Sequence, residues 1–241
     1  MSNIDPRMSV IDLAIGLFYV DYQQSKGNFN LMAASVFLQL NDDCTVLLRP
    51  ISEDEQTLQA GLTLTVSEQE DLDSIRHPGQ RVEWLACRVA IRELVDLQGL
   101  PYLGLQKDAF GKPHLVNLPW FVSLSHTGGW AAAVLHRSRP VGIDIEPIRD
   151  QFQRVVPRVL SNKEIAHANG DSGRLAVYWC AKEALYKLYG KRNLTFREHL
   201  HVEPFADGAD TLTGHVRLVD HKEQLIIRCF QTGPGLLAVA F

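Results

Sequence analysis

The sequence of 241 residues predicts an α+β protein made of two similar halves. Strand-like segments open and close the chain, and two long helices, over residues 80–97 and 174–189, each follow a strand-rich stretch. The first helix contains "WLACRVAIREL" and the second "YWCAKEALYKL", which share an aromatic start, a basic residue, an alanine two positions later and a closing leucine. This faint repeat predicts related halves over residues 1–138 and 139–241, although chance similarity between two amphipathic helices is an equal explanation.

In the first half, apolar alternation predicts strands before and after a helix. The cluster Asn41-Asp42-Asp43 is typical of a hairpin turn between two of these strands. Apolar residues three and four apart predict the helix, which Gly99 ends, and "FGKP" predicts a turn. The predicted strands cover residues 12–22, 33–40, 45–48, 114–116 and 121–124.

In the second half, residues 131–136 and 140–146 predict a hairpin joined through Arg137-Ser138-Arg139. Ser161-Asn162-Lys163-Glu164 is a capping box that starts a helix by satisfying its first N–H groups. Gly190 ends the longer helix that follows. Four further strands are predicted at residues 200–202, 212–218, 225–230 and 236–241.

Composition places the chain in the globular class, because 46% of its residues are hydrophobic. The net charge of -4 gives no general attraction to nucleic acid or anionic membranes, so we expect neither as a partner. The four cysteines are scattered without a C-x-x-C pair, which predicts reduced thiols, no disulfide and no zinc site. The N-terminus lacks a basic stretch leading into an apolar one, so we expect a cytoplasmic protein.

"VGIDIE" combines a buried strand face with two carboxylates. Side chains alternate along a strand, so Asp144 and Glu146 share the face opposite the branched apolar residues. Two such carboxylates repel each other unless water solvates them or a cation bridges them, and Mg²⁺ is a natural bridge to substrate phosphate. Gly142 on the same face predicts room for the substrate. The alternative is a solvated edge strand with its charges outward.

"WCAKEALYKLYG" places Glu183 and Lys187 on one helical face with Trp179. Alone, a Glu and Lys at this spacing indicate a surface ion pair. Close to the D-x-E strand, Glu183 supplies a third carboxylate, while Lys182 and Lys187 can contact phosphate oxygens. Three acids and two lysines together predict a metal–diphosphate site.

Weaker phosphate-binding candidates lie elsewhere in the sequence. "FVSLSHTGGW" offers Ser125, His126 and a Gly-rich turn, although a lone histidine in a turn is more often only solvated. Lys112 lies in the "FGKP" turn. Arg81 and Arg88 lie along the first helix and form either a basic patch or a solvated helix face.

In this order, "FGKP", "SLSHTGGW", "GIDIE" and "WCAKEALYK" resemble the motifs of 4'-phosphopantetheinyl transferases of the longer, pseudo-dimeric Sfp type. The resemblance spans residues 110–187 and fits the N-terminal half more loosely. It implies two similar α+β halves with one active site between them. It also implies transfer of the 4'-phosphopantetheine group of coenzyme A to a serine of an acyl, peptidyl or aryl carrier protein, with release of adenosine 3',5'-bisphosphate.

The resemblance assigns roles to individual residues. Asp144, Glu146 and Glu183 resemble the Mg²⁺ ligands, with Mn²⁺ as a substitute, and Glu183 or a metal-bound water is the base for the incoming serine. Lys187 resembles the lysine on the reacting phosphate. The expected coenzyme A contacts are Ser125, His126, Lys112, Lys182, Arg81 and Arg88. Val89 stands where the repeat places Glu183, so we expect one site per chain and a monomer.

Two other functions fit parts of the sequence. A catalytically silent coenzyme A-binding homologue would keep the motifs without the reaction. A metal-dependent nuclease also uses clustered acids and a lysine, but its E-x-K strand differs from the "IEP" found here. Carrier proteins are usually acidic where they dock, and Arg149, Phe152, Arg154 and Arg158 are candidate contacts. Fatty-acid, polyketide and nonribosomal peptide synthesis are equally compatible pathways.

Overall fold

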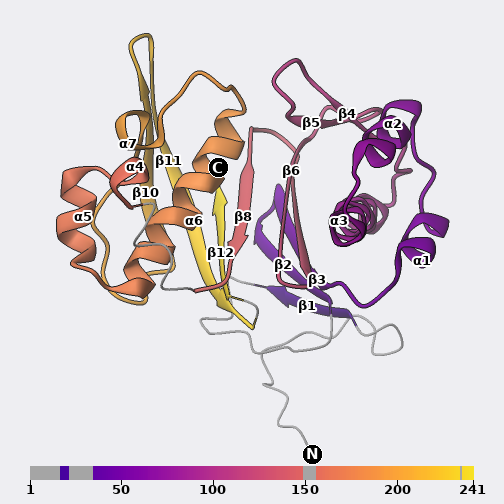
Figure 1. Cartoon of the computed structure of the whole chain (residues 1–241), viewed down its shortest axis with the longest axis horizontal. Coiled ribbons are helices and arrows are strands. Elements are labelled where there is room, and N and C mark those ends of the chain that lie inside the picture. The colour runs from indigo at the N-terminus through magenta and orange to yellow at the C-terminus, as the bar shows by residue number, and fades with distance from the viewer. Residues whose placement is uncertain (1–16, 22–34, 149–155, 234) are drawn as a thin grey trace, which may run out of the picture.

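The computed structural model describes residues 17–21, 35–148, 156–233 and 235–241. It is an α+β protein in which two sheets, each with its own helices, lie beside each other (Figure 1). Of the predicted first strand, only residues 17–21 lie within the described residues. No described helix is both long enough and apolar enough to span a bilayer.

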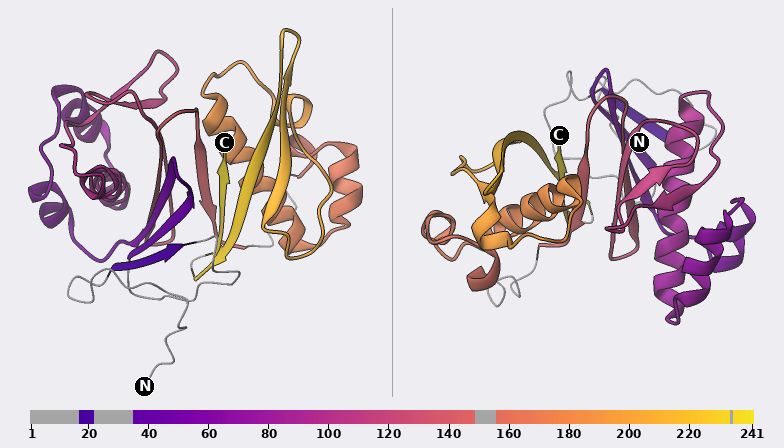
Figure 2. Two further views of the ribbon diagram at one scale, coloured as in Figure 1. Left: turned by 180° about the vertical axis from the view of Figure 1, so that it is seen from behind. Right: turned by 90° about the horizontal axis from the view of Figure 1, so that it is seen from above.

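The N-terminal half contains a seven-stranded sheet in the order β1-β2-β3-β7-β6-β5-β4. The longest helix, α3, packs against β7, β3 and β6 of this sheet (Figure 2). The elements are β1 (Leu17–Asp21), β2 (Ser35–Asn41), β3 (Cys44–Pro50), α1 (Glu55–Ala60), α2 (Val66–Ser74), α3 (Pro78–Leu97), β4 (Leu105–Lys107), β5 (Pro113–Leu115), β6 (Phe121–Thr127) and β7 (Trp130–His136).

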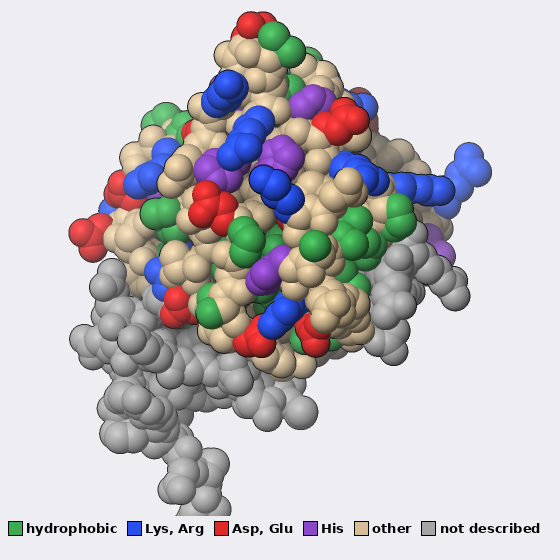
Figure 3. Space-filling view, turned by 90° about the vertical axis from the view of Figure 1, so that its left-hand side faces the viewer, with side chains coloured by type: hydrophobic (Ala, Val, Ile, Leu, Met, Phe, Trp, Pro, Cys, Tyr) green, Lys and Arg blue, Asp and Glu red, His purple; other side chains and the backbone are tan. Residues whose placement is uncertain are grey.

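The C-terminal half contains a five-stranded sheet in the order β8-β12-β11-β10-β9, and α6 packs across one of its faces. The outer side of this half carries Lys, Arg and His side chains interspersed with acids, as solvated surfaces do (Figure 3). The elements are β8 (Gly142–Glu146), α4 (Val156–Val159), α5 (Asn162–Ala168), α6 (Ser172–Tyr189), α7 (Phe196–His199), β9 (Leu200–Val202), β10 (Thr211–Leu218), β11 (His221–Thr232) and β12 (Gly235–Ala240).

The two halves share one topology. In each half, the strand that comes before the long helix in the chain pairs with the last strand of that half. The strands that come after the helix then lie side by side in the reverse of their chain order. The order β3-β7-β6-β5-β4 around α3 therefore corresponds to β8-β12-β11-β10-β9 around α6. The connection between β7 and β8 contains the predicted division at residues 138/139.

A second correspondence concerns a buried ion pair. α2 and α5 both begin with a capping box whose glutamate is almost completely buried. Glu68 of α2 lies 3.7 Å from Arg88 of α3, and Glu164 of α5 lies 2.7 Å from Lys182 of α6. The sequence repeat aligns Arg88 with Lys182, so the similarity of the two helices has a structural counterpart.

The halves meet along β8, which is an edge strand of the C-terminal sheet. Its N–H groups at Ile143 and Ile145 donate to the hydroxyls of Ser123 and Ser125 on β6, at 3.1 and 3.3 Å. The apolar face of β8 packs into a core shared with β2, β3, β7 and β12. Serine side chains from one half thus satisfy the exposed edge of the other.

Several predicted elements are confirmed, and one pairing is wrong. The turn at residues 41–43, the helix ending before Gly99 and the capping box at Ser161 are all present. The predicted hairpin of residues 131–136 and 140–146 does not form, because β7 pairs with β3 and β6 while β8 pairs with β12. Strand β4 and the helices α1, α2, α4 and α7 were not predicted from the sequence.

Candidate active site between the two halves

The contact between β8 and α6 brings the acidic residues together. A Cβ added to Gly142 would lie 2.0 Å from the carbonyl oxygen of Ala184, so only glycine allows α6 this close. The expectation that Gly142 leaves room for a substrate is therefore wrong, because the helix backbone occupies that room. α6 begins with an Asp171 N-cap and ends at Gly190 in the left-handed conformation.

Asp144 is the centre of a polar network that joins the two halves. Its Oδ1 accepts from the hydroxyl of Ser125 at 2.9 Å and from Nζ of Lys187 at 2.7 Å. Lys187 Nζ also lies 2.9 Å from Ser125 Oγ. Only 4% of Asp144 is exposed, so these contacts stabilise its charge where water cannot. β6, β8 and α6 each contribute one member.

The two other predicted metal ligands lie beside this network. Glu146 Oε1 accepts from Nε1 of Trp179 at 3.1 Å. Burial raises the pKa of Glu183, the negative charges of Asp144 and Glu146 add to the shift and Lys187 opposes it, so that the pKa lies at about 7. The pKa of Glu183 thus responds to both other carboxylates, as expected for three acids gathered at one site.

The arrangement fits a divalent cation without being preformed for one. Among the described residues, no three His, Cys, Asp or Glu side chains are close enough together to hold a metal as they stand. The Lys187 ammonium instead supplies the positive charge beside Asp144. Asp144 Oδ2, however, is buried and has no hydrogen-bond partner within the described part of the chain. An orphaned buried carboxylate oxygen next to two further acids is the donor set that Mg²⁺ prefers.

A cavity of about 300 Å³ opens between the halves next to Lys187. Four cationic side chains line it, and none of the described residues along its wall is acidic. Aromatic side chains from both halves form its apolar part. The charged and aromatic lining residues are Arg88, Lys107, Lys112, Lys187, Trp84, Phe110 and Tyr186.

The turn of "FGKP" closes one side of this cavity and is tied to the end of α6. Lys112 Nζ donates to the carbonyl oxygen of Leu188, and Arg192 Nε donates to that of Phe110 at 3.0 Å. Burial lowers the pKa of Lys112 to about 8. Lys112 has three donors, so the contact with the helix end leaves N–H groups for an anion in the cavity.

His126 and Arg88 border a second cavity of about 280 Å³ that shares Trp84 with the first. His126 Nδ1 lies 3.3 Å from a carboxylate oxygen of Glu83. Arg88 stacks on Trp84 with its guanidinium carbon 3.6 Å from a ring centroid, and burial lowers its pKa. Its Nε faces Glu68 at 3.7 Å, and Arg88 also lines the first cavity, which is the observation that fits an anion-binding role.

Arg81 has a structural role. Its Nε lies 2.8 Å from Glu55, and its Nη1 donates to the carbonyl oxygens of Leu72 and Ile75 at 2.6 and 3.3 Å. These contacts hold α1 and the end of α2 against α3. Arg81 lines neither of the two cavities described above.

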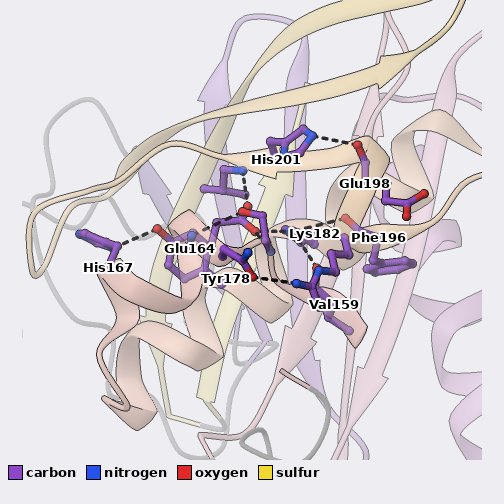
Figure 4. Close-up of polar contacts among 12 residues, drawn as sticks. Val159, Glu164, His167, Tyr178, Lys182, Phe196, Glu198 and His201 are labelled. Carbon is purple, nitrogen blue, oxygen red and sulfur yellow. Dashed lines mark hydrogen bonds and ion pairs between the residues drawn. The ribbon is translucent and has the colours of Figure 1, made fainter. Parts of the chain in front are cut away.

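Lys182 also lies away from the site, which corrects the expected phosphate contact. The side chain is fully buried, and its Nζ donates to Glu164 and to the carbonyl oxygens of Val159 and Phe196, at 2.7, 2.8 and 3.3 Å (Figure 4). All three of its donors are therefore used inside the C-terminal half. Lys182 joins α4, α5, α6 and α7 and has no free donor for coenzyme A.

Some residues at the site carry no sequence signal that we recognised. Ser123, Tyr186 and Arg192 were given no role from the sequence. In the structure Ser123 contacts β8, Tyr186 lines the first cavity and Arg192 binds the carbonyl oxygen of Phe110. Trp84 was noted only as part of the sequence repeat. It lies four residues before Arg88 on the same helix, and this spacing predicts that the Arg88 guanidinium stacks on the Trp84 ring. The proposed docking residues 149, 152 and 154 lie outside the described residues, and Arg158 is exposed on α4.

Comparisons with known proteins give a consistent result. The family model of the 4'-phosphopantetheinyl transferase superfamily matches residues 140–232. The chain is 23% identical over 196 residues to 4'-phosphopantetheinyl transferase ffp of Bacillus subtilis, covering 78% of this chain and 85% of that protein. It is 34% identical over 119 residues to 4'-phosphopantetheinyl transferase AcpT of Salmonella typhi and of Salmonella typhimurium, covering 46% of this chain and 60% of each relative.

Proposed function

Because the chain belongs to the 4'-phosphopantetheinyl transferase superfamily, we propose that it transfers the 4'-phosphopantetheine group of coenzyme A to a serine of an apo carrier protein. The serine oxygen would form a bond to the β-phosphorus of coenzyme A. The bond from that phosphorus to the adenosine 3',5'-bisphosphate would break, and the serine proton would pass to a base. One observation carries the proposal: Asp144, Glu183 and Lys187 converge beside a cationic cavity between the halves.

The cavity supports coenzyme A as the donor substrate. Coenzyme A carries a diphosphate and a 3'-phosphate, so its site must supply several positive charges. Lys107, Lys112, Lys187 and Arg88 supply them, and Trp84 and Phe110 offer apolar surface for the base or the pantetheine arm. His126 borders the adjoining cavity, where a second phosphate could lie.

Asp144, Glu146 and Glu183 would hold the divalent ion, Mg²⁺ or in its place Mn²⁺. Asp144 Oδ2 and the partly buried carboxylate of Glu183 offer oxygen donors for it. When bound, the ion would neutralise part of the diphosphate charge and polarise the reacting phosphate. Lys187 would stabilise the charge that develops on the same phosphate, since its ammonium already faces this site.

Glu183 is suited to accept the serine proton. A general base works best when its pKa lies near the working pH, and the pKa of Glu183 is about 7. Burial and neighbouring acids cause this value, so the base strength comes from the site. A cation bound between the carboxylates would lower this pKa again, which leaves a metal-bound water as the second candidate for the base.

The test is the intact mass of candidate apo carrier proteins after incubation with the protein, coenzyme A and Mg²⁺. We expect a gain of one phosphopantetheine group and equimolar adenosine 3',5'-bisphosphate. Removal of the metal with EDTA, or the change Glu183→Gln, is expected to abolish the gain. No gain with any carrier, together with tight coenzyme A binding, would instead identify a silent homologue; Mg²⁺-dependent cleavage of DNA would identify a nuclease.

We also propose a monomer, because both halves of one chain contribute to a single site. The four scattered cysteines, with no C-x-x-C pair, favour a cytoplasmic location. In the first half, Val89 holds the position equivalent to Glu183 and is buried in the core, so no carboxylate stands at that position. The carrier itself, whether of fatty-acid, polyketide or peptide synthesis, would be ranked by the same mass measurement. Size-exclusion chromatography with light scattering tests the monomer.

A further inference from the structure

The β4–β5 turn, residues 108–112, forms one wall of the cavity of about 300 Å³ between the halves. Phe110 and Lys112 of this turn line the cavity. One carboxylate oxygen of Asp108 accepts from the N–H groups of both residues, at 2.9 and 3.0 Å, and the Asp108 N–H donates to the carbonyl oxygen of Lys112 at 3.0 Å. Because Asp108 ties the turn together, a change in how the turn is attached would shift Phe110 and Lys112 as a unit.

The β4–β5 turn belongs to the first half but is attached to the second. Arg192, which follows the end of α6, donates from Nε to the carbonyl oxygen of Phe110 at 3.0 Å. Lys112 Nζ donates to the carbonyl oxygen of Leu188 in the last turn of α6. A Cβ added to Gly111 would lie 3.3 Å from Arg192 Nη2, so the two segments also pack closely. Arg192 therefore holds the backbone of the turn, whereas Lys112 is held only by the tip of its side chain.

The two attachments differ in what a bound ligand does to them. The Lys112 ammonium borders the cavity, so its N–H groups are shared between the Leu188 carbonyl and a phosphate that binds there. Arg192 is outside the cavity lining formed by the described residues, and it binds a backbone carbonyl. A ligand in the cavity does not need its N–H groups, so the Arg192 contact is the one that holds the turn when the cavity is filled.

We propose that Arg192 is a positioning residue for coenzyme A, which holds the β4–β5 turn against the end of α6 and so keeps Lys112 and Phe110 along the cavity wall. This inference rests on the proposed function. α6 also carries Glu183 and Lys187, so the same contact sets the place of the turn relative to the groups expected at the reacting phosphate. Arg192 itself touches neither coenzyme A nor the metal.

The experiment measures the affinity of Arg192→Met for adenosine 3',5'-bisphosphate, the nucleotide part of the donor, by calorimetry in EDTA. We expect binding about ten-fold weaker than in the wild type, within the range usual for residues coupled through shared contacts. Arg192 is exposed, so the variant should fold, which urea denaturation checks.

Lys191→Met is the matched control. Lys191 is adjacent to Arg192, carries the same charge and is also exposed, and its ammonium lies over the ring of Tyr189 at 5.7 Å. Loss of an exposed charge near the cavity acts only through solvent, where salt screens it. The nucleotide affinity of Lys191→Met should therefore stay within about two-fold of the wild-type value.

A double-variant cycle separates positioning from a direct contact. In the Lys112→Met background the turn has no ammonium to present to the nucleotide. We therefore expect Arg192→Met to lower the affinity by only about two-fold more in that background. A direct ligand, or a residue that supports the fold in general, would cause the same loss in both backgrounds.

Three results would overturn the inference. The first is wild-type nucleotide affinity in Arg192→Met. The second is an equal loss of affinity in Lys191→Met, which would leave only a general effect of charge. The third is an undiminished loss in the Lys112→Met background.

The same titrations keep this inference apart from the proposed function, because they need no carrier protein. A wild type whose nucleotide affinity depends on Arg192 and Lys112 as expected, but which modifies no carrier, would overturn the proposed function and support Arg192 as the residue that positions the nucleotide site. A wild type that binds no adenosine 3',5'-bisphosphate would overturn both.

Discussion

Replacing Glu183 with Gln removes an ionisable group that is costly to charge in the folded protein. Its pKa rises from an ordinary 4.5 to about 7, chiefly through burial and then through Asp144 and Glu146. The folded state therefore keeps its proton at pH values where the unfolded chain has lost it. The contribution of Glu183 to the free energy of unfolding therefore falls by about 3 kcal/mol as pH rises from 4.5 to 7, and it is constant above pH 7.

The change Glu183→Gln should abolish this part of the pH dependence. Relative to the wild type, we expect the variant to gain about 2 kcal/mol in free energy of unfolding between about pH 5.5 and about pH 8.5. Partial exposure of the side chain makes this an upper value. Urea denaturation at the two pH values, in EDTA, measures the difference.

A matched control is Glu70→Gln, because Glu70 is exposed on α2. That variant should follow the wild type at both pH values. If Glu183→Gln also tracks the wild type across the range, the Glu183 carboxylate is not held in a buried position beside Asp144 and Glu146 in the folded protein. A metal site shared by these three residues would then be contradicted.

Three other predictions concern packing and charge. Lys182→Met leaves Glu164 charged and unpaired, so urea denaturation should show a loss of about 3–5 kcal/mol, and adding Glu164→Gln should recover part of it. Gly142→Ala forces α6 away from β8 and should cost about 3 kcal/mol or more by the same assay; wild-type stability would contradict the close packing. Lys112 loses its charge as pH rises through about 8, so calorimetry should show weaker binding of adenosine 3',5'-bisphosphate above that pH, and Lys112→Met should flatten the dependence.

Local pattern predicted much of the fold and the core of the site. Alternation along β8 placed Asp144 and Glu146 on one face, and helical spacing placed Glu183 and Lys187 on another; the structure brings these faces together. Strand pairing was harder, because the turn after His136 shows where β7 ends but not which sheet receives β8. That choice depends on contacts between residues far apart in sequence, such as Val239 with Ile143.

Lys182 shows a second limit. It precedes Glu183 directly, and adjacent helical residues point about 100° apart, so one faces the site and the other faces α5. The signal that could have separated them was the capping box at Ser161, whose Glu164 needs a buried cation. The counterpart in the first half, Thr65 to Glu68 with Arg88, carries the same signal and marks a helix that we had not predicted.

The central claim is that one divalent ion lies between Asp144, Glu146 and Glu183. Anomalous X-ray diffraction from crystals grown with Mn²⁺ and coenzyme A tests it most directly. The account predicts a single strong peak within coordination distance of carboxylate oxygens from both β8 and α6, with the coenzyme A diphosphate as a further ligand. Coenzyme A bound in the cavity with no peak at these residues, or with the peak elsewhere, would contradict it.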